Sequence, residues 1–164
     1  MRSVTDVTVQ GLEVPLKNKY RQLGILMSAL LPILLIVLGY MSTVTKPPVT
    51  EVSDCPKYTQ GYVKDGQVHL CSSQLTMPRN VVINHEVVHL IQYKLGVDTL
   101  LPAPVVSYLV HHNLSESEVL PVLVHYSESG YINAELEARL LQKLPDSAIM
   151  IMYKLANDYA YLTS

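Results

Sequence analysis

The sequence contains no tryptophan and no phenylalanine, and eleven tyrosines take their place. It has only two cysteines, too few for a domain held together by several disulfides but enough for one bridge. The formal net charge is −2, so the charge balance does not favour a nucleic-acid partner. Internal repeats and low-complexity tracts are also missing. What remains is a chain of 164 residues, long enough for one domain and an additional segment.

Charged residues are absent from one long stretch, which runs from Gln22 to Thr45. It includes about nineteen mostly apolar residues, enough for a helix to span the hydrocarbon core of a bilayer. A cleavable signal peptide would have a shorter apolar core and an A-x-A cleavage site, which this stretch lacks. We therefore expect a transmembrane helix over residues 22–45, with an uncleaved or late-cleaved signal as the alternative.

Basic residues are unevenly distributed around this stretch. Lys17, Lys19 and Arg21 precede it, whereas only Lys46 follows directly. The excess of positive charge predicts a cytoplasmic tail over residues 1–21 and a single-pass orientation with the rest of the chain outside the cytoplasm. Two prolines in residues 46–54 predict an extended linker, so the expected soluble domain covers residues 55–164.

The first part of that domain has the pattern of a β-hairpin. Asp65-Gly66 is a strong tight-turn signal, and polar and apolar residues alternate over Gln67–Cys71, the expected second strand. In this register Cys71 lies opposite about Gln60, only a few residues from Cys55. We expect a Cys55–Cys71 disulfide, which an oxidising compartment would preserve, with two unlinked thiols as the alternative.

The central motif of the chain lies in Arg79–Gly96, where Pro78 and Gly96 are start and stop signals for a helix. This helix contains the pattern HExxH, formed by His85, Glu86 and His89. Side chains four residues apart share one helix face, so both imidazoles can bind one cation, with Glu86 near enough to act on a water activated by the metal. The pattern is typical of zinc hydrolases. The alternative is a core helix whose histidines bond to neighbouring residues.

The remainder of the chain is predicted to be helical, which gives an α+β fold that is mostly helical: a small hairpin followed by a zincin-like helical domain. A capping-box pattern at Ser115 and Glu118 precedes one of these helices. The expected helices cover residues 103–112, 119–126, 134–144 and 147–162.

A catalytic zinc needs a third protein ligand. The extended pattern HExxHxxGxxH would supply a histidine, but its glycine and histidine positions hold Gln92 and Leu95. The third ligand is therefore expected to be a carboxylate on a later helix. Gln92, one turn beyond His89, is a candidate for orienting an imidazole.

With these residues the chain resembles the gluzincin class of zinc metallopeptidases. The class carries a glutamate ligand in patterns such as E-x-x-A-D, and Glu135-Leu136-Glu137-Ala138-Arg139 is similar, with Arg139 where a small acid or amide is usual. The resemblance implies that Glu135 is the third ligand and that Gln67–Cys71 is an edge strand that pairs with extended substrate. A helical wheel instead favours Glu137, which lies nearer the leucines, so both glutamates remain candidates.

The implied function is peptide-bond hydrolysis at a zinc ion held by His85, His89 and Glu135, with Glu86 as the general base. The partners would be a polypeptide substrate and the lipid bilayer. The oxyanion donor could be any of His111, His112, His125, Tyr126 and Tyr131. One alternative is a membrane-anchored binding or structural module with a structural or inactive zinc site. A weaker alternative is hydrolysis of a non-peptide substrate such as a cell-wall component.

Overall fold

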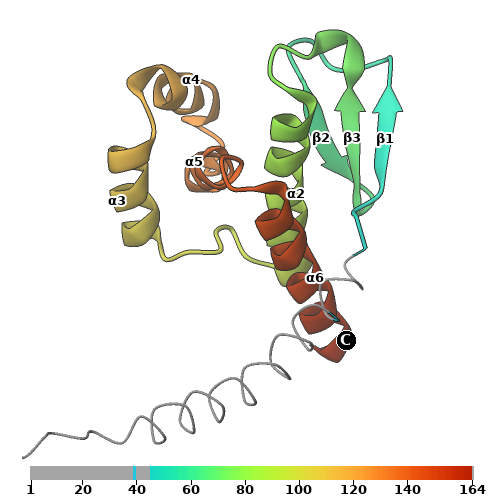
Figure 1. Cartoon of the computed structure of the whole chain (residues 1–164). Coiled ribbons are helices and arrows are strands. Elements are labelled where there is room, and N and C mark those ends of the chain that lie inside the picture. The colour runs from blue at the N-terminus through green and yellow to red at the C-terminus, as the bar shows by residue number, and fades with distance from the viewer. Residues whose placement is uncertain (1–38, 40–44, 164) are drawn as a thin grey trace, which may run out of the picture. The chain divides into compact units, whose positions relative to one another are not determined.

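The computed structural model describes residue 39 and residues 45–163 (Figure 1). This part of the chain is mostly helical with one small sheet, which confirms the α+β class. The strands are β1 (Val49–Val52), β2 (Gly61–Lys64) and β3 (Gln67–Cys71), followed by a short 3-10 turn, η1 (Ser72–Gln74). The helices are α2 (Arg79–Leu95), α3 (Ala103–Asn113), α4 (Glu116–Tyr126), α5 (Ile132–Leu141) and α6 (Asp146–Thr163).

The predicted cytoplasmic tail and transmembrane helix lie outside the described residues, apart from residues 39 and 45. Among the helices of the described part, none combines the length and the apolar character needed to cross a bilayer.

The predicted hairpin is present, because β2 and β3 pair antiparallel with Lys64 opposite Gln67 and Gly61 opposite Leu70. Asp65 and Gly66 both have positive φ angles, 51° and 72°, as a two-residue hairpin turn requires. The pairing continues beyond β2, where the amide of Cys71 donates to the carbonyl of Gln60 at 2.9 Å. This register brings Cys55 to Cys71, and the two form the predicted disulfide.

The third strand, β1, comes from the segment that we interpreted as a linker. It pairs parallel with β3, with Val49 opposite Val68, and gives the strand order β1-β3-β2. Its sequence, VTEV, is rich in β-branched residues, which suit a strand. The prediction that Gln67–Cys71 is an edge strand is therefore wrong, since β3 is paired on both sides and the outer strands of the described sheet are β1 and β2, with β2 beside α2.

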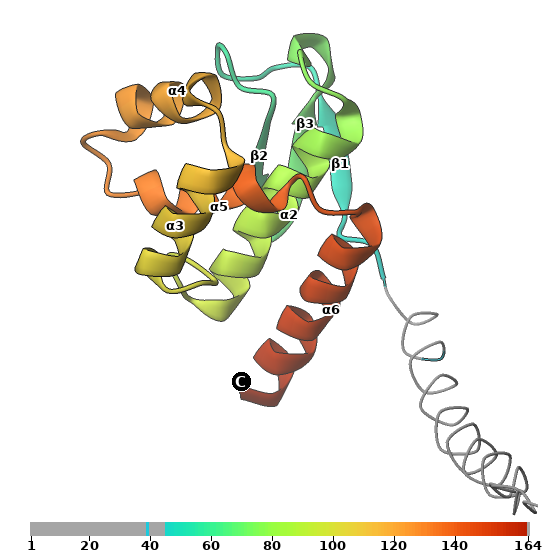
Figure 2. The ribbon, with the colours of Figure 1, turned by 60° about the vertical axis from the view of Figure 1, so that its left-hand side comes forward.

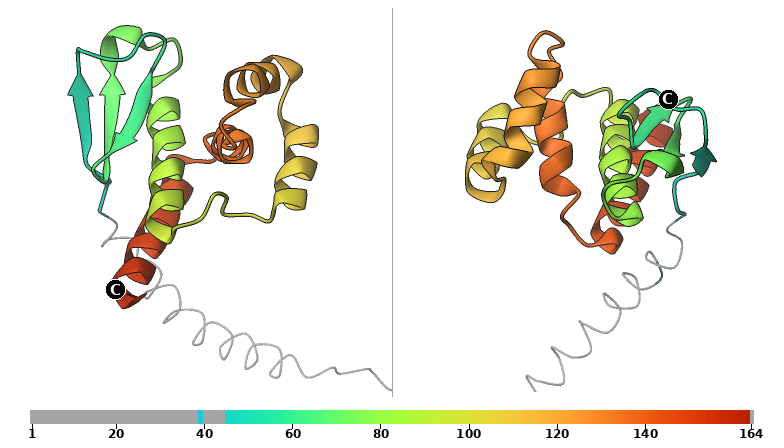
Figure 3. Two further views of the ribbon diagram at one scale, coloured as in Figure 1. Left: turned by 180° about the vertical axis from the view of Figure 1, so that it is seen from behind. Right: turned by 90° about the horizontal axis from the view of Figure 1, so that it is seen from above.

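Helix α2 is the central element of the described fold and lies between the sheet and the later helices (Figures 1 and 2). Its buried apolar residues pack against the sheet and against α6, which runs alongside it. A second apolar cluster joins α3, α4 and α5 on the far side of α2 from the sheet (Figure 3). The first cluster consists of Val68, Val87, Val88, Leu90, Ile91, Ala138, Ile149, Tyr153 and Ala156, and the second of Val106, Val110, Val122 and Leu136.

Local signals set the helix boundaries as expected. Helix α2 begins directly after Pro78 and ends at Gly96, whose positive φ of 64° forms a left-handed C-cap. Helix α4 begins with the predicted capping box, in which Ser115 and the side chain of Glu118 exchange hydrogen bonds. Gly96 therefore marks the end of α2, and the capping box marks the start of α4.

Candidate metal centre

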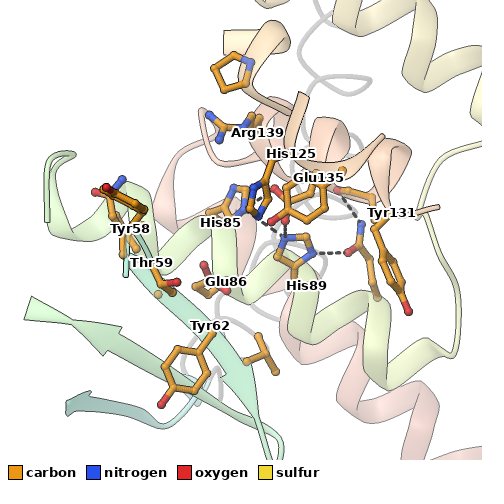
Figure 4. Close-up of a pocket in the computed structure, with 18 of the residues that line it drawn as sticks. Tyr58, Thr59, Tyr62, His85, Glu86, His89, His125, Tyr131, Glu135 and Arg139 are labelled. Carbon is orange, nitrogen blue, oxygen red and sulfur yellow. Dashed lines mark hydrogen bonds and ion pairs between the residues drawn. The ribbon is translucent and has the colours of Figure 1, made fainter. Parts of the chain in front are cut away.

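Three predicted ligands from α2 and α5 meet at one point (Figure 4). The Nε2 atoms of His85 and His89 are 3.2 Å apart. Glu135 Oε1 lies 3.1 Å from His89 Nε2, and its Oε2 lies 3.4 Å from His85 Nε2. The three side chains therefore form a group that could hold a metal ion.

The separations between these donor atoms fit a small tetrahedral cation. Ligand atoms that each lie about 2.0–2.1 Å from a tetrahedral zinc are about 3.3–3.4 Å from one another. The two Nε2 atoms are 3.2 Å apart, and each lies 3.1 or 3.4 Å from its nearer Glu135 oxygen, which is close to this spacing. Two imidazoles and one carboxylate are also the donor set of many catalytic zinc sites.

Two glutamine amides hold the outer ring nitrogens of the histidines. Gln142 Oε1 lies 3.0 Å from His85 Nδ1, and Gln92 Oε1 lies 2.8 Å from His89 Nδ1. An amide oxygen only accepts, so each Nδ1–H donates and each Nε2 is the ring nitrogen that faces the site. The predicted contact of Gln92 is confirmed. The contact of Gln142 was not predicted, although a helical wheel puts Gln142 on the face of Glu135.

The two candidate glutamates of α5 have different surroundings. Glu135 faces the histidines, whereas Glu137 is completely buried and accepts hydrogen bonds from the backbone amides of Leu100 and Leu101 at 2.7 and 2.8 Å. Glu137 also accepts from Gln92 Nε2 at 2.9 Å. Glu137 therefore fixes the loop between α2 and α3, and through Gln92 it supports the orientation of His89.

Opposing effects set the charge states of the three-residue group. Burial alone would raise the pKa of Glu135, but hydrogen bonds and charge from His85 and His89 hold that pKa well below its usual range. Burial alone would lower the pKa of His89, but the hydrogen bond and charge of Glu135 raise it above the ordinary value. In the metal-free protein the Glu135 carboxylate is therefore the counter-ion of a protonated His89. The proton takes the place that a metal cation could take.

Glu86, the predicted general base, lies beside this group and is 7% exposed. Burial raises the pKa of its carboxyl, and the neighbouring histidines offset this only in part. Its side chain rests against the β2 backbone, where a side chain on Gly61 would be too close. A buried carboxyl with a raised pKa suits a group that takes up and releases a proton.

The group opens into a cleft of about 1290 Å³ between the hairpin, α2, α4 and α5. Three of the five candidate oxyanion donors, His125, Tyr126 and Tyr131, line this cleft, whereas His111 and His112 do not. Burial, followed by the charge of Glu135 and a hydrogen bond to it, raises the pKa of Tyr126 to about 12. Sequence reasoning did not assign Tyr58, Thr59, Tyr62 and Arg139 to the site, and all four line the cleft (Figure 4).

No protein-family model, no curated protein and no solved structure matches this chain. The resemblance to gluzincins therefore rests on the short motifs alone and stays a prediction.

Proposed function

We propose that this chain is a membrane-anchored, zinc-dependent metallopeptidase. The observation that carries the proposal is the convergence of two imidazole lone pairs and a carboxylate at the spacing of tetrahedral zinc ligands. Two lone pairs that face each other at 3.2 Å repel unless a cation or a proton lies between them. Structural zinc sites are usually closed by four protein ligands, whereas three ligands beside an open cleft are typical of catalytic sites.

Each residue of the centre has a role in this proposal. His85, His89 and Glu135 would hold the metal, and Gln92 and Gln142 would orient the imidazoles. A zinc ion supplies Lewis-acid chemistry at such a site, activating a water and polarising a carbonyl group. Glu86 would accept the proton of the attacking water and pass it to the leaving amine.

The cleft supports a polypeptide substrate in extended form. Strand β2 has a free edge in the described sheet, and three of its residues, Gly61, Tyr62 and Val63, line the cleft beside Glu86. An extended peptide can add to such an edge through backbone hydrogen bonds. The role that the sequence suggested for β3 therefore passes to β2 in this proposal. Tyr126 is the preferred oxyanion donor, since it lines the cleft and its phenol lies against Glu135 of the centre.

In this proposal the domain lies outside the cytoplasm, and the predicted membrane helix of residues 22–45 anchors it to the bilayer. The Cys55–Cys71 disulfide supports this, because disulfides persist in oxidising compartments and are rare in the cytosol.

The test uses the full chain, purified in detergent and supplied with zinc. Bound metal is measured, and cleavage of an unfolded protein is compared between the wild type, Glu86→Gln and the exposed control Glu128→Gln. We expect Glu86→Gln to keep its zinc and to lose at least about 100-fold in rate, as for removal of a general base, with Glu128→Gln unchanged. Zinc binding without cleavage that depends on Glu86 would contradict the peptidase and favour a binding module.

A further inference from the structure

Arg139 is a cation in the wall of the cleft, and no described residue forms an ion pair with it. It lies on α5, four residues after Glu135, and lines the same cleft as the three-residue group. None of the ion pairs between described residues includes it. In the view of Figure 4 it lies above His85, on the α5 side of the site.

The position of Arg139 on α5 makes the lack of an ion pair with a described residue unexpected. A glutamate and an arginine four residues apart on a helix ordinarily pair with each other. Here Glu135 instead directs both of its oxygens to the histidines. The guanidinium of Arg139 is therefore not neutralised by the nearest carboxylate of its own helix.

The burial of part of the Arg139 side chain is a second reason to expect a binding partner. The Nε atom of Arg139 is buried and, within the described residues, has no hydrogen-bond acceptor. A buried donor that stays unpaired destabilises the protein, and the cost is larger for a charged group. An anionic group bound in the cleft would give the guanidinium the counter-charge that no described residue provides.

The geometry of the group selects the ligand chemistry. A guanidinium is planar and presents paired N–H donors that match the two oxygens of a carboxylate. It stays charged at any relevant pH, so it attracts an anion rather than a neutral amide. Of the groups that a polypeptide offers, only a carboxylate combines negative charge with this shape.

We propose that Arg139 forms a subsite that binds a carboxylate of the peptide substrate next to the metal centre. The proposal rests on the proposed function, because the peptide is its ligand. Four residues of helix separate Glu135 and Arg139 by about 6 Å along the axis. Since an extended peptide advances about 3.3 Å per residue, the carboxylate lies within two or three residues of the bond at the metal.

Two parts of a peptide can supply that carboxylate: its C-terminus, or the side chain of an aspartate or glutamate. The first would make the enzyme favour bonds near the end of a chain, and the second would make it favour acidic sequences. Both carboxylates would bind to the same paired N–H donors of Arg139. The experiment therefore varies the peptide as well as the protein.

The experiment measures binding separately from turnover. The full chain with Glu86→Gln, loaded with zinc, is titrated with fluorescent peptides of one sequence in three forms: free C-terminus, amidated C-terminus, and amidated with one internal aspartate at successive positions. We expect one carboxylate-bearing form to bind about 10- to 100-fold more tightly than the plain amide, as for a charged hydrogen-bonded pair. Adding Arg139→Gln should abolish this difference, and Arg139→Lys should keep part of it.

The matched control is Arg79→Gln, which removes an arginine that pairs with Glu51 outside the cleft and should leave all affinities unchanged. Zinc content and thermal stability of each variant show whether the fold survives the change. Equal affinities for all peptide forms would overturn the subsite, as would a preference for carboxylate that survives Arg139→Gln. These results are independent of cleavage: a wild type that cleaves acid and amide peptides equally well refutes the subsite alone, and a wild type that cleaves none refutes the proposed function alone.

Discussion

A β-carbon built on Gly61 would lie 2.8 Å from Cγ of Glu86, closer than side chains approach one another. It would also lie 3.1 Å from Val82 Cγ1 and 3.2 Å from Glu86 Oε1. The β2 strand and the glutamate of the HExxH motif are therefore fitted to each other, and the glycine leaves the space in which the carboxylate lies. This contact ties the proposed substrate-binding strand to the proposed general base.

We predict that Gly61→Ala lowers kcat by about 100-fold while zinc content stays unchanged, because a displacement of about 1 Å is enough to disrupt catalytic geometry. The measurement is steady-state cleavage by the metal-loaded protein. Lys64→Ala, an exposed position on the same strand, is the control and should leave kcat unchanged. Wild-type kcat in Gly61→Ala would contradict a positioning role, and so would a loss of zinc that accounts for the whole effect.

The two glutamates of α5 should respond in opposite ways to substitution. Glu135→Ala should abolish zinc binding, since it removes one of three ligands. Glu137→Ala should lower the free energy of unfolding of the metal-free protein by about 1–3 kcal/mol, because it leaves the part-buried amides of Leu100 and Leu101 without their acceptor. Zinc titration and denaturant unfolding measure the two effects. A Glu137→Ala protein of normal stability that cannot bind zinc would reverse the assignment.

The amides behind the histidines should tune metal affinity. We expect Gln92→Ala and Gln142→Ala each to weaken zinc binding by about 10- to 100-fold, as is usual when the partner of a ligating histidine is removed. Competition with a chelator of known affinity gives the constants. Gln67→Ala, on the exposed part of β3, serves as the control. Affinities equal to that of the wild type would mean that the ring orientation is set by packing alone.

Sequence patterns were informative where the relevant contacts are local. The turn at Asp65-Gly66, the cap at Gly96 and the four-residue spacing of His85 and His89 all act within a few residues, and the structure follows them. The bridge between Cys55 and Cys71 followed from the hairpin register for the same reason.

Contacts between segments that are distant in the chain could not be predicted from local sequence patterns. Gln142 contacts His85 across 57 positions of the chain. The helical wheel puts Gln142 on the face of Glu135 but does not show which residue of another helix that face contacts. The parallel pairing of β1 with β3 likewise joins a proline-flanked segment to a strand about twenty residues later, and this turned the expected edge strand into a central one. The helical wheel favoured Glu137 over the predicted ligand Glu135, because burial does not distinguish a ligand from a carboxylate that accepts hydrogen bonds from backbone amides.

Glu118 and Lys143 should make stability depend on pH. A 2.8 Å ion pair with Lys143, together with bonds from Ser115, lowers the pKa of Glu118 to about 2. A depressed folded-state pKa contributes stability above the unfolded value of about 4.3, and this contribution is lost as pH falls toward 2. Glu118→Gln should therefore be slightly less stable than the wild type at pH 6, by less than about 1 kcal/mol for so exposed a pair, and equally stable near pH 2. A difference that is constant over this range would mean that charge is not its cause.

X-ray absorption at the zinc edge of the metal-loaded full chain tests the proposed centre most directly. We predict one zinc per chain with four nitrogen or oxygen ligands at about 2.0–2.1 Å, two of them imidazoles, and loss of this signal in His85→Ala and Glu135→Ala. Failure to bind zinc, sulfur ligands at about 2.3 Å, or a spectrum that is unchanged in both variants would contradict a centre built from His85, His89 and Glu135.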